Sequence, residues 1–170
     1  MQKVHGVMLS TGVALFLSLA VAAVSAAQPS KQVKSSDTQQ IERGRYLVKI
    51  TGCNDCHTPG YTQRAGKVPE NEWLIGDRVG WWGPWGTTYA GNLRNYMNAI
   101  SESQWVKVAR TAEFRPPMPW FTLHDMTEQD LRAIYRFVKH LGPSGDPAPA
   151  YLPPDHEPKG PYILFPRPPK

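Results

Sequence analysis

The chain has 170 residues and a formal net charge of +5, and its 17 prolines and 14 glycines predict a loop-rich domain with terminal extensions. The lysines and arginines form no dense cluster, which argues against nucleic-acid binding. The excess positive charge suits an acidic protein partner or an anionic membrane surface, or it serves solubility alone.

The N-terminal segment predicts a secretory signal peptide at residues 1–27. Lys3 precedes an almost wholly apolar run from Val7 to Val24, and Ala26 and Ala27 are small residues that suit a cleavage site. The alternative is an uncleaved membrane anchor, because an apolar run of about 18 residues approaches the length that spans a bilayer. Either way, the folded part is expected outside the cytoplasm, in the periplasm of a bacterium.

The next stretch predicts a flexible leader at residues 28–37, because it is polar and contains a proline. A helix with one apolar face is expected from Thr38 to Ile50, with Asp37 as its N-cap. Gly44 lies inside this helix, where glycine costs about 1 kcal/mol relative to alanine. Close approach by a neighbouring segment would explain it. The folded domain is predicted to span residues 38–142.

The only two cysteines of the chain occur in the segment Cys53-Asn54-Asp55-Cys56-His57. This Cys-x-x-Cys-His pattern is the attachment signature of a c-type haem. Cys53 and Cys56 would form thioethers to the porphyrin, and the neutral imidazole of His57 would bind the iron. A dithiol redox site is the weaker reading because no βαβ pattern flanks the motif, and a zinc site would need a second ligand pair. The sequence therefore predicts one covalently bound haem c.

Three of the chain's six tryptophans fall in the segment Trp81–Trp85, which is punctuated by glycines and predicted to be a loop. Its indole N–H groups could face the haem propionates, which would make it a wall of the haem pocket. The alternative is ordinary packing of a surface loop. A small turn or hairpin is expected near Thr87–Asn92.

Two further helices carry clear end signals. Ser101 and Gln104 fit a capping box for a helix that ends near Ala112, before a run of prolines. The last helix is expected from Glu128 to Leu141, with Thr127 as its N-cap. Its apolar residues fall on one face, and Gly142 ends it.

Between these helices, Met118 lies among three prolines in Arg115-Pro116-Pro117-Met118-Pro119-Trp120. These prolines keep the segment non-helical and stiff, so the methionine is placed to offer its thioether to a metal. We therefore expect Met118 to be the second axial ligand of the haem iron. Met97, Met126 and His124 are the alternatives, although each has a simpler interpretation as core filler, hydrophobic staple or solvated loop residue.

The C-terminal residues 143–170 include ten prolines, which predicts a tail without regular structure. The tail also contains aromatic and aliphatic residues from Tyr151 to Phe165. At least part of it is therefore expected to dock, either on the domain or on a partner.

Several stretches together resemble the class I cytochrome c fold, and the haem domains of periplasmic alcohol dehydrogenase cytochrome subunits in particular. The motifs that carry the resemblance, besides the haem signature, are Arg43–Val48, Thr88–Leu93, Pro117–Trp120 and Thr127–Tyr135. They cover about residues 40 to 142.

The resemblance implies an all-α domain of three or more helices around one haem, held by Cys53 and Cys56 and ligated by His57 and Met118. It places Gly44 and Tyr46 where the first and last helices cross, near Tyr135. It also makes Pro69 a candidate for the carbonyl that orients His57.

A haem iron with both axial positions filled favours electron transfer over catalysis. The sequence therefore predicts a periplasmic mono-haem electron carrier rather than an enzyme, with redox proteins such as a dehydrogenase, a terminal oxidase or another cytochrome as partners. Membrane association is expected if the N-terminal segment is retained. The alternative is a haem enzyme or sensor whose open sixth position binds a small molecule.

Overall fold

A computed structural model describes residues 29–166 of the chain. The signal peptide predicted for residues 1–27 lies outside this range. Within residues 29–166, no helix is long and apolar enough to cross a membrane. The elements are, in chain order, α1 (Pro29–Ile50), α2 (Cys53–His57), the 3-10 turn η1 (Glu70–Glu72), β1 (Gly80–Gly83), β2 (Gly86–Tyr89), α3 (Leu93–Ala99), α4 (Glu102–Thr111), α5 (Trp120–Asp125), α6 (Glu128–Leu141) and β3 (Tyr162–Leu164).

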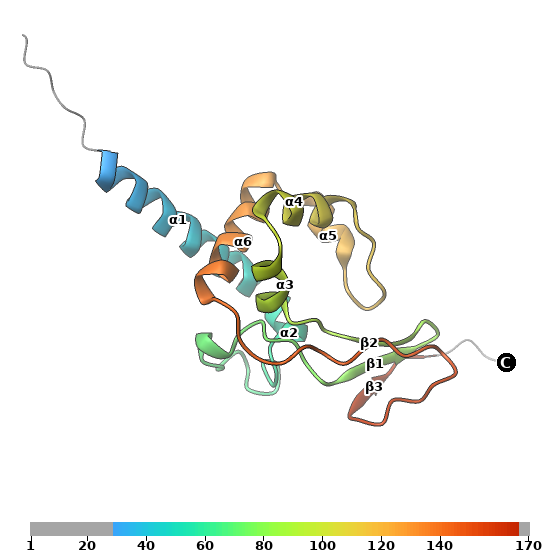
Figure 1. Ribbon diagram of the computed structural model, residues 1–170. Coiled ribbons are helices and arrows are strands. Elements are labelled where there is room, and N and C mark those ends of the chain that lie inside the picture. The colour runs from blue at the N-terminus through green and yellow to red at the C-terminus, as the bar shows by residue number, and fades with distance from the viewer. Residues whose placement is uncertain (1–28, 167–170) are drawn as a thin grey trace, which may run out of the picture.

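The helices form one body and the strands a smaller one beside it (Figure 1). The helical core centres on α6, whose buried apolar side chains pack against α1, α3 and α4. Gly44 is where α1 meets α6, because a Cβ there would lie 2.0 Å from the carbonyl oxygen of Ala133 and 2.7 Å from Cβ of Phe137. The predicted close approach at Gly44 is confirmed.

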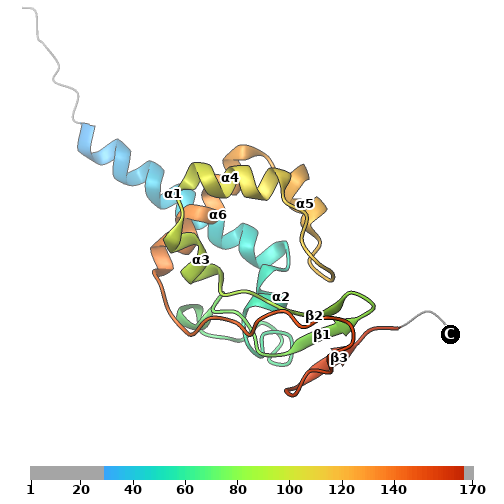
Figure 2. The same cartoon turned by 45° about the vertical axis from the view of Figure 1, so that its right-hand side comes forward.

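Helix α1 begins at Pro29, so the prediction of a flexible leader over residues 28–37 is wrong from that residue onward. Proline is well suited to the first position of a helix, and neither glycine nor proline interrupts the next fourteen residues. The first turns of α1 project away from the rest of the described chain (Figures 1 and 2). Asp37 is therefore not an N-cap. It lies inside the helix, with its carboxylate 3.5 Å from the guanidinium of Arg136.

Helices α4 and α6 begin and end at the residues predicted from the sequence. Ser101 and Gln104 form both hydrogen bonds of the capping box at the start of α4, and Ala112 is its C-cap. Thr127 caps α6 by accepting a hydrogen bond from the backbone N–H of Asp130, and Gly142 follows its last turn with φ at 69°.

The strands correct two predictions. The glycine-punctuated segment is part of a hairpin rather than a loop, with β1 antiparallel to β2, and this hairpin starts earlier than the one expected near Thr87–Asn92. The tail also contains a regular element, because β3 pairs in parallel with β1 to give the sheet order β2-β1-β3. The expectation that part of the tail docks on the domain is confirmed.

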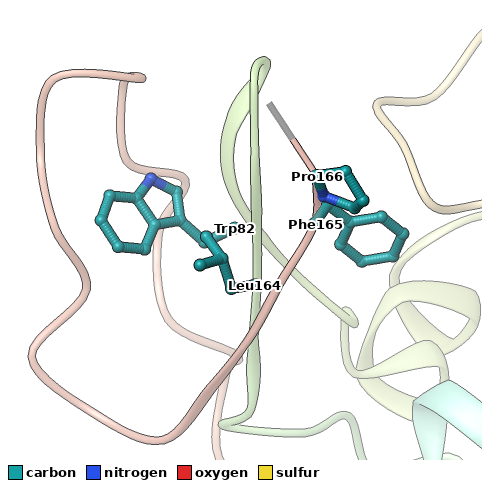
Figure 3. Close-up of a pocket in the computed structure, with 4 residues that line it drawn as sticks. All are labelled: Trp82, Leu164, Phe165 and Pro166. Atoms are coloured by element: carbon teal, nitrogen blue, oxygen red, sulfur yellow. The ribbon is translucent and has the colours of Figure 1, made fainter. Parts of the chain in front are cut away.

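Aromatic side chains of the hairpin meet the tail on both faces of this sheet. The Trp82 ring contacts Tyr162, with the ring centroids 5.2 Å apart. The Trp81 and Trp85 rings contact Phe165, with centroids 6.0 and 5.0 Å apart. Figure 3 shows Trp82 and Phe165 pointing to opposite sides of β3, where they line a shallow surface hollow with Leu164 and Pro166.

Candidate haem site

Helix α2 carries all three residues of the haem signature. Helix α1 ends at Ile50, and Gly52 then adopts a left-handed conformation with φ at 75°, which turns the chain into α2. Cys53, Cys56 and His57 are spaced by three and four residues, so their side chains leave one face of the short helix.

The imidazole of His57 is oriented by a single hydrogen bond. Its Nδ1 lies 2.7 Å from the carbonyl oxygen of Gly91. A carbonyl can only accept, so Nδ1 carries the proton and the lone pair on Nε2 is free for a metal. Burial lowers the pKa of His57, which favours the neutral imidazole. The predicted partner Pro69 is wrong, because its carbonyl instead accepts a hydrogen bond from Glu72 at the 3-10 turn.

Cys53 and Cys56 are not joined in a disulfide. Burial raises the pKa of Cys53, and burial together with the negative charge of Asp55 raises that of Cys56. Both sulfurs are therefore neutral near pH 7. This is a suitable environment for apolar thioethers.

Buried hydrogen bonds fix α2 against the next loop. Thr58 donates from Oγ1 to Oδ1 of Asn54, at 2.8 Å, and accepts from the backbone N–H of Leu74, also at 2.8 Å. The backbone N–H of Gly76 donates to the His57 carbonyl at 2.9 Å. The signature residues thus lie on a rigid base.

Met118 lies in the loop between α4 and α5, half-buried, and packs against the same apolar core as Cys53. Its backbone is held in a tight turn, with its N–H 3.3 Å from the Arg115 carbonyl and its carbonyl 2.9 Å from the Trp120 N–H. In both ribbon views, the tip of this loop and α2 lie beside the hairpin (Figures 1 and 2).

The other ligand candidates have structural partners. Met97 is fully buried in the core. Met126 is the C-cap of α5 and packs partly against the core. His124 has its Nε2 3.2 Å from the Ala112 carbonyl.

Three buried polar atoms of the hairpin lack a hydrogen-bond partner, and they bear on whether the chain fits a haem. The indole nitrogen of Trp85 and the hydroxyls of Thr87 and Thr88 are buried, and no atom of the described residues bonds to them. A buried donor without a partner costs about 1–3 kcal/mol, so such atoms indicate a missing acceptor. The propionate carboxylates of a haem are acceptors of this kind. The thiols, the oriented imidazole and these donors all fit the group.

Gly91 is the residue of the site that the sequence reasoning missed. It lies in Thr88–Leu93, one of the motifs that carry the resemblance, but nothing local marks its carbonyl as the partner of His57. Within residues 29–166, no group of three or more histidine, cysteine, aspartate or glutamate side chains could hold a metal ion.

Comparison with known proteins gives one match. A family model described as Cytochrome c matches residues 41–142, a range that contains α2, the Met118 loop and α6 but not the tail. Neither the curated proteins nor the solved structures gave a significant match.

Proposed function

The chain belongs to the cytochrome c family and carries covalently bound haem c, and on this premise we propose that it is a periplasmic mono-haem electron carrier with His57 and Met118 as the iron ligands. Its mostly helical domain fits the class I fold of that family. When bound, the haem supplies an iron that accepts and releases single electrons.

The observation that carries the proposal is the hydrogen bond from Nδ1 of His57 to the Gly91 carbonyl at 2.7 Å. It fixes the tautomer and the ring orientation, so His57 presents Nε2 on the face from which Cys53 and Cys56 also project. The two thiols would hold the haem against α2. An imidazole restrained in this way limits reorganisation when the charge of the iron changes.

Met118 is the proposed second ligand. The proline-rich loop presents it in a tight turn, half-buried and beside the apolar core that Cys53 also contacts. Histidine–methionine ligation would raise the reduction potential relative to bis-histidine or thiolate ligation. With both axial positions filled, small molecules would have to displace Met118, so electron transfer to docked redox proteins is the expected activity.

The apolar N-terminal sequence and the chemistry of covalent haem attachment support a location of the protein in the periplasm. Partners would be redox proteins of that compartment, such as a dehydrogenase, a terminal oxidase or another cytochrome. Contacts with them would be small and transient.

Replacement of Met118 by alanine tests the ligand pair. The oxidised wild-type holoprotein should show the charge-transfer band of a methionine–ferric haem pair, and Met118→Ala should lose it and lower the reduction potential. The matched control is Met126→Ala, which should keep the band. Rapid carbon monoxide binding by the reduced wild type, with no such band when oxidised, would instead support an enzyme or sensor with an open iron.

A further inference from the structure

The proline-rich tail is attached to the hairpin by backbone pairing. Leu152 and Thr87 form an isolated antiparallel bridge, in which the Thr87 N–H donates to the Leu152 carbonyl at 2.8 Å and the Leu152 N–H donates back at 3.1 Å. The hairpin turn lies directly against the tail, because a Cβ on Gly86 would lie 2.3 Å from the Leu152 carbonyl oxygen and 2.9 Å from the Tyr151 ring. The backbone at Tyr151 is therefore fixed relative to β2.

The Tyr151 side chain is fixed as well. Its hydroxyl donates a hydrogen bond to the Trp85 carbonyl at 2.9 Å. The ring therefore stands at a defined place beside the hairpin turn.

The Tyr151 ring contacts the loop that carries Met118. The guanidinium carbon of Arg115 lies 3.9 Å from the ring centroid, which is a close cation–π contact. No carboxylate of the described residues pairs with Arg115, so the ring is its principal side-chain partner. The Arg115 carbonyl in turn accepts the hydrogen bond from the Met118 N–H.

We propose that the tail acts as a strap over the ligand loop, in which Tyr151 is a positioning residue that holds Met118 in place through Arg115. This inference rests on the proposed ligation by Met118. The tail lies outside the range 41–142 that the family model matches.

The strap should change how often Met118 leaves its position. An added ligand binds only while the methionine is displaced, so its apparent affinity reports the displaced fraction. A cation–π contact at an exposed site shifts such an equilibrium roughly two- to fivefold. Loss of the contact should therefore tighten the binding of an added ligand by that factor.

The test is a titration of the oxidised holoprotein with imidazole, which competes with the methionine. Tyr151→Leu should bind imidazole about two- to fivefold more tightly than the wild type. Tyr151→Phe keeps the ring and loses only the hydroxyl bond to Trp85, so its imidazole affinity should lie between those of the wild type and Tyr151→Leu. The matched control is Tyr162→Leu, which removes a tail tyrosine that packs on Trp82 instead and should leave the imidazole affinity unchanged.

Arg115→Gln gives an independent reading, because it removes the cation from an exposed loop and should match Tyr151→Leu even if the latter folds poorly. Wild-type affinity in both variants would overturn the strap. Met118→Ala separates the two ideas. If it binds imidazole no more tightly than the wild type, the ligand assignment fails and the strap with it. If it binds far more tightly while Tyr151→Leu and Arg115→Gln do not, the strap alone fails.

Discussion

Gly44 sets the distance between the first and last helices. Glycine is a poor helix former, yet here its missing Cβ is what lets α1 pass within contact of the α6 backbone. The atom that a larger residue would meet is the Ala133 carbonyl oxygen, which cannot move without shifting a turn of α6. Close packing at this point outweighs local helix propensity.

Replacing Gly44 with alanine should destabilise the holoprotein by about 1–3 kcal/mol, as overpacking of a core does, even though alanine favours the helix by about 1 kcal/mol. Denaturant unfolding would measure the change. Gly160→Ala is the matched control, since a Cβ there meets nothing within 4 Å, and its effect should stay within about 0.5 kcal/mol. A Gly44→Ala protein as stable as the wild type would show that the helices can separate freely.

At the end of helix α6, three backbone carbonyls surround the guanidinium of Arg94. This buried guanidinium, from α3, donates to the carbonyls of Leu141 and Gly142 at the end of α6 and, at 2.7 Å, to that of Asn71. The last carbonyls of a helix have no partner within the helix, and a cation is favourable at that end. One side chain thus joins α3, the end of α6 and the 3-10 turn η1.

Lysine at position 94 keeps the charge, but its donors radiate from one nitrogen, whereas three different nitrogens of Arg94 bind the three carbonyls. Arg94→Lys should therefore lower the free energy of unfolding by about 1–3 kcal/mol, the cost of leaving a buried acceptor unpaired. Thermal or denaturant unfolding is the measurement. Arg110→Lys, on the exposed side of α4, should differ from the wild type by no more than about 0.5 kcal/mol. If both variants lose the same free energy of unfolding, the three hydrogen bonds of Arg94 contribute nothing to stability.

Across the whole molecule, ion pairs connect α1, α4 and α6. Arg43 donates to Asp130 at 3.0 Å, and this hydrogen bond lowers the pKa of Asp130. Burial alone would raise the pKa of Glu102, but hydrogen bonds from Arg132 and Arg136 outweigh it and the net direction is down. Both carboxylates therefore stabilise the fold when they are charged.

The pH dependence of stability follows from these directions. Each folded-state pKa lies below its ordinary value of 3.8 or 4.5, so the contribution is complete above that value and is lost as the pH falls through the folded pKa. Asp130→Asn and Glu102→Gln should each destabilise the protein by about 0.2–1 kcal/mol at pH 7 and flatten the acid limb of the profile. Denaturant unfolding between pH 3 and pH 7 measures this. The control is Glu113→Gln, in an exposed loop, which should leave the profile unchanged. An acid limb like that of the wild type in Asp130→Asn and Glu102→Gln would contradict the stabilising role of these two carboxylates.

The sequence predicted those parts of the molecule whose determinants are local. The ends of α4 and α6 depend on caps within one turn of the helix, and the haem signature is contiguous. Helices α3 and α5 are only seven and six residues long, so tertiary contacts decide them. The sheet pairs Gly80 with Tyr162, and His57 finds Gly91 across 34 residues. No local pattern encodes such partners, so they were missed. The partners of Arg94 and the contact between Tyr151 and Arg115 were missed for the same reason.

Strand β3 leaves an apolar edge of the described sheet exposed, with Tyr162, Ile163 and Leu164 at 39%, 45% and 59% of full exposure. Strand edges of this kind can template pairing with another chain and lead to aggregation. Pro161 precedes β3 and Pro166 lies two residues beyond it, and neither has an N–H to donate. The prolines that make the tail irregular therefore also keep its free edge too short for another molecule to extend into a fibril.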